Sequence, residues 1–175
     1  RMEVKIDSPD PNTHAGEIIC RGTNLMLGYY KNPEATAQII DKDGWLHTGD
    51  LGTMDNQGYV TIRGRSKNLL LNSSGHNIYP EEIESKLNNM LYVSESLIVL
   101  QNDKLVALIY PDFDEAFANG LQQPDIEKAM ENNRIELNLQ LPSYSQITKV
   151  KIHFEEFEKT AKKSIKRFMY QEAKG

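Results

Sequence analysis

Two runs of apolar, β-branched residues constrain the fold of this chain most strongly. They lie within SESLIVLQNDKLVALIYPD, residues 94–112, and flank the dipeptide Asn102-Asp103. Asn and Asp tolerate the backbone conformations of a tight two-residue turn, and β-branched side chains favour extended backbone. The segment therefore predicts an antiparallel hairpin.

Helical patterns lie on both sides of this hairpin. Before it, Pro80 stands where a helix would begin, and Glu81 and Glu82 fall in the first turn, where the helix dipole favours acidic side chains. The apolar positions that follow share one helical face: Ile83, Leu87, Met90 and Leu91. After the hairpin, a second helix is predicted to begin near Pro124.

The end of the chain predicts a strand and a last helix. KVKIHF, residues 149–154, is strand-like. SIKRFMYQEA, residues 164–173, favours a helix with Ile165, Phe168 and Met169 on one face. Upstream of the helix that begins at Pro80, two short strands are expected around a tight turn at 73–75.

The first third of the chain is turn-rich. Strands are expected over residues 2–6, 17–22 and 59–62, and a short helix over 32–40 with Pro33 in its first turn. DKDGWLHTGDLG, residues 41–52, carries three glycines and is predicted to be a loop.

The order helix, hairpin, helix, strand, helix describes a compact α+β domain. The best boundary before it is RGRSK, where turn-rich sequence gives way to periodic sequence. We therefore expect a β-rich part over residues 1–66 and an α+β domain over residues 67–175.

Charge and composition exclude several function classes. The net charge of −5 argues against general nucleic-acid binding, which usually brings a basic domain. The single cysteine, Cys20, cannot form an internal disulfide, fits a reducing compartment and is expected to be a buried apolar residue. No apolar run reaches membrane-spanning length and the start does not resemble a signal peptide, so a cytoplasmic location is expected.

Several polar residues are candidates for binding. Asp50, in HTGDLG, could accept both protons of a vicinal diol, although a loop closed by an Asx turn is the commoner explanation of such a pattern. Arg65 could bind phosphate or ribose, or could simply be a solvated strand end. His76 could titrate near neutral pH or have no role. No metal site is expected, because the histidines that remain lack metal-ligand spacing: His14, His47 and His153.

The basic run in FEKTAKKSIKRFMY, residues 157–170, is the last candidate. Its charges point in several directions around a helix, so a solvated helix end is the ordinary explanation. Polyanion binding would predict aromatic or glycine interleaving and a wider basic surface, which this run lacks.

In combination these motifs are specific. GEIICRGTNLMLGYYKNPEATAQIIDKDGWLHTGDLG, GRSKNLLLNSSGHNIYPEEIE and EKTAKKSIKRF, in this order, resemble the C-terminal portion of adenylate-forming acyl-CoA synthetases, in particular the long-chain fatty-acid–CoA ligases. The resemblance covers essentially the whole chain. It implies the last piece of a large AMP-binding domain followed by a hinge and a mobile C-terminal lid domain. No Ser/Thr/Gly-rich phosphate loop is present, so the isolated chain is expected to be inactive.

The resemblance implies two chemical steps and assigns residues to them. ATP with Mg²⁺ activates a fatty acid to an acyl-adenylate, and coenzyme A then displaces AMP while the C-terminal domain swings about the hinge. Asp50, with Thr48, matches the motif that binds the ribose hydroxyls, and Arg65 matches an arginine that contacts ribose or phosphate. Lys67 matches the hinge position. The loop that meets the pantetheine arm is matched by Gly75, His76 and Asn77.

The catalytic lysine does not align. The family places this lysine immediately before an isoleucine, and here Ser164 precedes Ile165. A serine cannot supply the positive charge, so three explanations stay open: Lys163 serves instead, Lys162 does, or the parent protein adenylates weakly. We favour Lys163.

Other functions also stay open. A carrier-protein adenylation domain or another acyl-acid ligase would share these motifs, because the acyl pocket lies outside this sequence. A non-catalytic AMP-sensing or interaction module is the alternative from another class, and Ser164 favours it. The acyl chain length, the oligomeric state and a peripheral contact of the parent with a membrane are left undecided.

Overall fold

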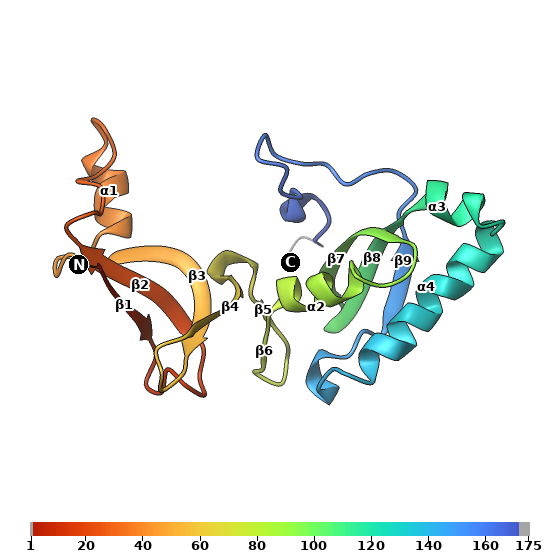
Figure 1. The fold of residues 1–175 in the computed structure, drawn as a ribbon, viewed down its shortest axis with the longest axis horizontal. Coiled ribbons are helices and arrows are strands. Elements are labelled where there is room, and N and C mark those ends of the chain that lie inside the picture. Colours follow the sequence, from red (N-terminus) through yellow and green to blue (C-terminus); the bar gives the residue numbers. More distant parts are fainter. Residues whose placement is uncertain (1, 172–175) are drawn as a thin grey trace. The chain divides into compact units, whose positions relative to one another are not determined.

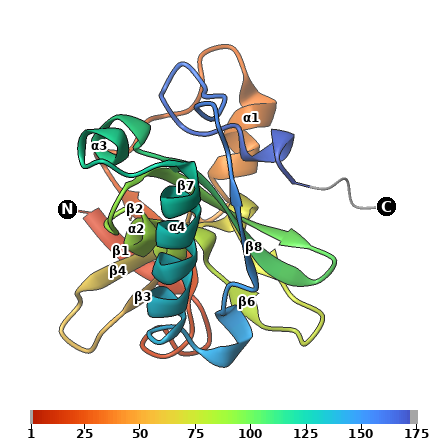
Figure 2. The same cartoon turned by 90° about the vertical axis from the view of Figure 1, so that its right-hand side faces the viewer.

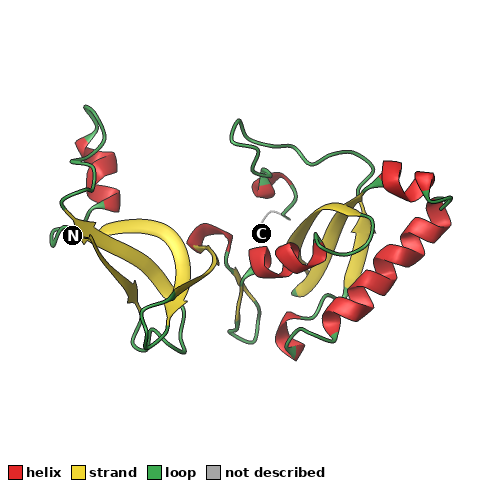
Figure 3. Cartoon of the chain, viewed as in Figure 1, coloured by secondary structure: helices red, strands yellow, loops and turns green. Residues whose placement is uncertain are grey.

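The computed structural model describes residues 2–171 (Figures 1 and 3). The chain divides into two compact units, which we call the first unit, ending at Asn68, and the second unit, beginning at Leu69. Both α-helices and β-sheets are present, so the predicted α+β class is confirmed. No helix within residues 2–171 is long and apolar enough to cross a membrane.

The first unit contains a four-stranded antiparallel sheet in the order β1-β2-β3-β4. Its strands are β1 (Met2–Asp7), β2 (Gly16–Gly22), β3 (Leu46–Met54) and β4 (Val60–Arg65). Helix α1 (Pro33–Ile39) begins where Pro33 predicted, because the Asn32 side chain accepts a hydrogen bond from the Ala35 amide. Cys20 is buried, as expected.

The prediction of a loop over residues 41–52 is wrong for its second half. Residues from Leu46 onward form β3, which pairs with β2 on one side and with β4 on the other. The glycines absorb irregularities instead of ending the strand: Gly49 has a φ of +74°, and the β3–β4 register shifts between Leu51 and Gly52. The hydrogen bonds of two neighbouring strands therefore outweigh the turn propensity of this segment.

The second unit is built around a three-stranded sheet in the order β7-β8-β9. Its elements are β5 (Leu70–Leu71), β6 (Asn77–Ile78), α2 (Pro80–Leu87), β7 (Val93–Gln101), β8 (Lys104–Pro111), α3 (Phe113–Ala118), α4 (Gln123–Asn138), η2 (Ser143–Ser145), β9 (Lys149–Ile152) and η3 (Arg167–Met169). The predicted hairpin is confirmed as β7 and β8, and Asn102 and Asp103 both adopt positive φ in its turn. Strand β9 pairs with β8 in parallel.

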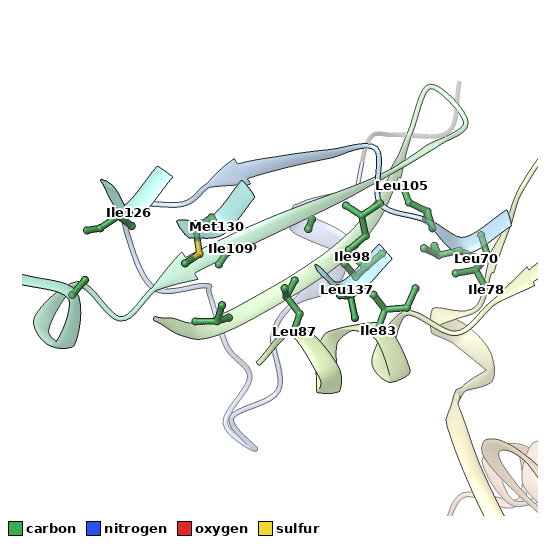
Figure 4. Packing of buried hydrophobic residues seen from close by; sticks show 14 residues of the cluster. Leu70, Ile78, Ile83, Leu87, Ile98, Leu105, Ile109, Ile126, Met130 and Leu137 are labelled. Atoms are coloured by element: carbon green, nitrogen blue, oxygen red, sulfur yellow. The ribbon is translucent and has the colours of Figure 1, made fainter. Parts of the chain in front are cut away.

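The two faces of this sheet are covered by different elements. Helices α2 and α4 cover one face, where Ile83 and Met130 pack against strand residues such as Ile98 (Figures 2 and 4). The alternate strand residues face the other way, and Phe157 is buried against them. These alternate residues are Leu97, Val99, Val106 and Leu108. Successive side chains of a strand point to opposite sides, and these strands carry consecutive apolar residues, so both faces of the sheet are apolar.

The helices agree only in part with the sequence pattern. Helix α2 begins at Pro80 as predicted but ends at Leu87, so Leu91 is 71% exposed and does not belong to its apolar face. Helix α3 was not predicted; the Asp112 side chain caps it by accepting from the Glu115 amide. Such a short helix has too few residues to show a periodic pattern.

The predicted helix over residues 164–173 is wrong for the described residues. Only Arg167–Met169 form a short 3₁₀ turn, and Phe168 and Met169 are exposed instead of lying on a buried face. Residues 172 and 173 of that prediction lie outside the described residues.

Candidate functional site

Asp50 and Arg65 face each other across the β3–β4 ladder. They are register partners, and Arg65 Nε lies 3.0 Å from Asp50 Oδ1. Arg65 Nη1 also donates to the Thr48 carbonyl oxygen at 3.2 Å. The structure thus brings together all three residues that the sequence proposed for nucleotide binding. Asp50 offers carboxylate oxygens to hydroxyl groups, and Arg65 offers a planar set of donors suited to phosphate.

Thr48 and Gly49 are held by β2. The Thr48 hydroxyl donates to the Ile18 carbonyl at 2.7 Å and accepts from the Asp50 amide at 3.1 Å. The Gly49 amide donates to Glu17 Oε1 at 2.8 Å. The backbone that carries the Asp50 carboxylate is therefore fixed from the neighbouring strand.

His47 extends this support. Its Nδ1 lies 2.7 Å from Glu17 Oε2, and its Nε2 lies 3.7 Å from Asp41 Oδ2. The hydrogen bond to Glu17 is the main cause that raises the pKa of His47, and Asp41 adds to it. Glu17 lies 30 positions before His47 in the chain, so no local pattern predicts their contact. Asp41 is close to the motif, but it was predicted only as part of the loop over residues 41–52 and was given no role.

The β5–β6 turn carries the residues proposed to meet coenzyme A. Gly75 has a φ of +79°, and nothing lies within 4 Å of the place where a Cβ would be. The Asn72 side chain accepts from the His76 amide at 2.9 Å, and the His76 ring stacks on Tyr144 at 4.6 Å between centroids. Asn77 begins β6. The turn is thus open at Gly75, while the neighbouring His76 ring stacks on Tyr144.

The base of the same turn is tied to the β7–β8 turn. The Ser73 amide donates to Asp103 Oδ1 at 2.8 Å, and the Ser73 hydroxyl donates to Asp103 Oδ2. The hydrogen bond from the Ser73 hydroxyl is the main cause that lowers the pKa of Asp103.

The basic segment forms a hairpin, which we call the basic hairpin, residues 159–165. Lys159 and Ile165 are bridge partners, and the Thr160 amide donates to the Ser164 carbonyl at 2.8 Å. The Lys163 amide donates to the Thr160 carbonyl at 2.9 Å, and Lys163 adopts a φ of 60°. The tip of the hairpin therefore consists of Ala161, Lys162 and Lys163.

Ion pairing divides the cations of this region into two groups. Lys159 lies 2.7 Å from Glu95, Lys166 lies 3.4 Å from Glu158, and Arg167 pairs with Glu84. Within residues 2–171, neither Lys162 nor Lys163 pairs with a carboxylate, and both are exposed. The expectation that Arg167 is a solvated helix charge is wrong, because its guanidinium is largely buried on Glu84.

The other proposed residues occupy separate places. Lys67 lies in η1 (Ser66–Asn68), at the end of the first unit. Ser164 is exposed beside the hairpin tip. Within the described residues, no group of three His, Cys, Asp or Glu side chains could hold a metal ion.

Comparison with known proteins identifies the class. Residues 67–173 match the model of the AMP-binding enzyme C-terminal domain, so the chain belongs to this family. A 2-methylpropanoate–CoA ligase of Humulus lupulus is 33% identical over 98% of this chain and 31% of its own length. A long-chain-fatty-acid–CoA ligase of Salmonella typhimurium is 48% identical over 47% of this chain and 15% of its own length. The chain spans about a third or less of the relatives it matches.

Solved structures agree with this assignment. ATP-bound MatB from Rhodopseudomonas palustris shares 26% identity with a TM-score of 0.69, over 97% of this chain and 33% of that one. The adenylation domain of a carboxylate reductase from Mycobacterium chelonae has a TM-score of 0.79 at 20% identity, over 97% of this chain and 29% of that one, and supports the fold alone. The chain thus belongs to the AMP-binding enzyme C-terminal domain family, and the two relatives named above are CoA ligases of different carboxylic acids.

Proposed function

We propose that this chain serves both half-reactions of a long-chain fatty-acid–CoA ligase. In the first, a carboxylate oxygen bonds to the α-phosphorus of ATP, the bond to the β-phosphate bridge breaks, and pyrophosphate leaves. In the second, the thiol of coenzyme A gives up its proton to solvent, its sulfur bonds to the acyl carbon, the bond from that carbon to the phosphate oxygen of AMP breaks, and AMP leaves. The observation that carries the proposal is the Asp50–Arg65 pair, fixed across two strands in a member of this family.

The first unit binds the nucleotide in this proposal. Asp50 accepts hydrogen bonds from the two ribose hydroxyls, because an ionised carboxylate can accept from a vicinal diol. Arg65 donates to ribose or phosphate while keeping the Asp50 carboxylate in place. Thr48 holds the backbone between them. Mg²⁺ enters with ATP as part of the substrate.

The basic hairpin supplies positive charge in this proposal. Negative charge builds on phosphate and carboxylate oxygens during adenylation, and a preorganised cation stabilises it. Lys163 is assigned this role, since Lys159, Lys166 and Arg167 are already paired with carboxylates. Lys162, which is also exposed at the tip, is the alternative. Lys67 serves as the hinge residue about which the C-terminal domain swings between the two half-reactions.

The β5–β6 turn receives coenzyme A in this proposal. A glycine at its open tip lets the thiol-bearing arm pass close to the backbone. His76 and Asn77 flank this passage. The choice of a long-chain acid rests on the similarity to the Salmonella enzyme, while the Humulus lupulus relative favours 2-methylpropanoate, a short branched acid.

Nucleotide binding is tested with Asp50→Ala in the full-length parent enzyme. The KM for ATP should rise by about 10- to 100-fold, the equivalent of losing charge-assisted hydrogen bonds worth roughly 1.5–3 kcal/mol. Asp43→Ala, at an exposed carboxylate of the turn before β3, is the matched control. An unchanged KM would remove Asp50 from the nucleotide site. Pyrophosphate release with a long-chain acid and with 2-methylpropanoate decides the substrate.

A further inference from the structure

Arg167 and Glu84 form a buried two-pronged ion pair. Arg167 Nη1 lies 2.7 Å from Glu84 Oε1, and Arg167 Nη2 donates to Glu84 Oε2 at 2.8 Å. Their side chains are only 11% and 10% exposed. A paired guanidinium fork fixes both position and orientation, because two parallel hydrogen bonds leave little rotational freedom. This ion pair joins residues that are 83 positions apart in the chain.

The ion pair is also attached to the sheet. Glu84 Oε1 accepts from the Ile98 amide at 2.7 Å, and Arg167 Nη1 donates to the Ile98 carbonyl at 3.1 Å. Strand β7 lies at the edge of its sheet. The backbone of the edge strand therefore finds hydrogen-bond partners in the ion pair, which attaches Arg167 to the fully buried Ile98.

Arg167 follows the basic hairpin directly. Ile165, the last hairpin residue, packs with Tyr170 on the face of the sheet opposite to α2 and α4. The Lys166 amide donates to the Glu158 carbonyl at 2.8 Å, and the Tyr170 hydroxyl accepts from the Glu158 amide at 2.8 Å. These contacts hold the two ends of the hairpin together beside Arg167, and the tip projects away from them.

We infer that Arg167 and Glu84 form a clamp that positions the tip of the basic hairpin for adenylation. The clamp acts through the backbone and does not touch the nucleotide, so Arg167 is a positioning residue. The inference rests on the proposed function. It would let the hairpin tip, whose lysines pair with no carboxylate among residues 2–171, present a lysine at a defined place.

The test uses the full-length parent enzyme and three measurements. Arg167→Lys keeps the charge and loses the fork, and Arg167→Met loses both. Lys166→Met is the matched control, because Lys166 is a neighbouring cation whose partner Glu158 is 61% exposed. Pyrophosphate release reports adenylation, thioester formation from supplied acyl-adenylate reports the second half-reaction, and amide hydrogen exchange over residues 157–170 reports the order of the hairpin.

Both Arg167 variants should slow pyrophosphate release, by about 10- to 100-fold, since a displacement of about 1 Å can cost that much. Hydrogen exchange over the hairpin should accelerate in the same variants. Thioester formation should stay at the unmodified rate, and Lys166→Met should match the unmodified enzyme in all three measurements.

Three outcomes would overturn the inference. Equal loss of both half-reactions in Arg167→Lys would mean that the ion pair only stabilises the fold. Unchanged pyrophosphate release would mean that the tip does not need the clamp. Slower release with unchanged hydrogen exchange would mean that Arg167 contacts the substrate itself. An unmodified parent that forms no acyl-adenylate would instead overturn the proposed function, and the inference with it.

Discussion

The two regions proposed to act during adenylation are held in different ways. Asp50 and Arg65 lie on neighbouring strands, and the hydrogen bonds of the β3–β4 ladder set them opposite each other. Lys163 lies at an exposed hairpin tip, and the Arg167–Glu84 ion pair that anchors it is several residues away. On a strand, the backbone hydrogen bonds to the neighbouring strand fix where a side chain lies. The position of a hairpin tip depends instead on the contacts at the base of the hairpin. A substitution at that base can therefore displace the tip.

Replacing the tip lysine should give the largest effect. Lys163→Ala in the full-length parent removes the proposed cation and should reduce pyrophosphate release by about 100-fold or more, the scale of losing one preorganised electrostatic donor. Lys162→Ala, one position away on the same tip, should leave the rate near normal. The reverse pattern would transfer the role to Lys162. Near-normal rates in both variants would remove the hairpin tip from the chemistry.

The open glycine turn should give a smaller and more selective effect. Gly75→Ala adds a methyl group at the proposed passage of the thiol arm and should slow thioester formation by about tenfold, while pyrophosphate release stays normal. Gly120→Ala is a matched control, because both glycines have a φ of +79° and open space around them. Each variant should lose roughly 1–2 kcal/mol of stability from the left-handed backbone. Equal thioester rates in the two variants would contradict the assignment of Gly75.

The strand-borne region should show the smallest effect, as a pH dependence of stability. The pKa of His47 is raised above 6.5, so its ion pairs stabilise the folded state below that pH, and this contribution is lost as the pH rises through the folded-state value. His47→Gln should lower the free energy of unfolding by up to about 1 kcal/mol at acidic pH, since the pair is partly exposed. At alkaline pH the loss should shrink.

Denaturant unfolding of the chain at several pH values measures this difference. Glu17→Gln should remove most of the same pH dependence, because the hydrogen bond that His47 donates to Glu17 is the main cause of the raised pKa. A His47→Gln loss that stays constant across pH would show that the histidine acts by packing alone.

The sequence predicted those elements whose signals are local. The Asn102-Asp103 turn, the Pro80 start of α2 and the α4 pattern each depend on residues within a few positions of one another. The same is true of the Thr48-Gly49-Asp50 motif. These signals placed most of the second unit and three of the residues in the first unit that the structure brings together.

The predictions of secondary structure from the sequence were wrong where contacts with residues distant in the chain determine the conformation. Residues 46–54 carry turn-forming glycines but become a strand because β2 and β4 supply hydrogen bonds on both sides. The basic segment has helical spacing but becomes a hairpin, because Ile165 and Tyr170 gain more by packing on the sheet than a short isolated helix would offer.

The amino-acid sequence by itself thus determined the family, the hairpin of the second unit, its two main helices and the residues proposed for the nucleotide. Only the tertiary structure decided which cations of the basic segment are engaged and which remain at its tip. The physical reason is distance along the chain. Glu84 and Arg167 are 83 positions apart and meet through the fold of the second unit, and no local pattern encodes a contact at that separation.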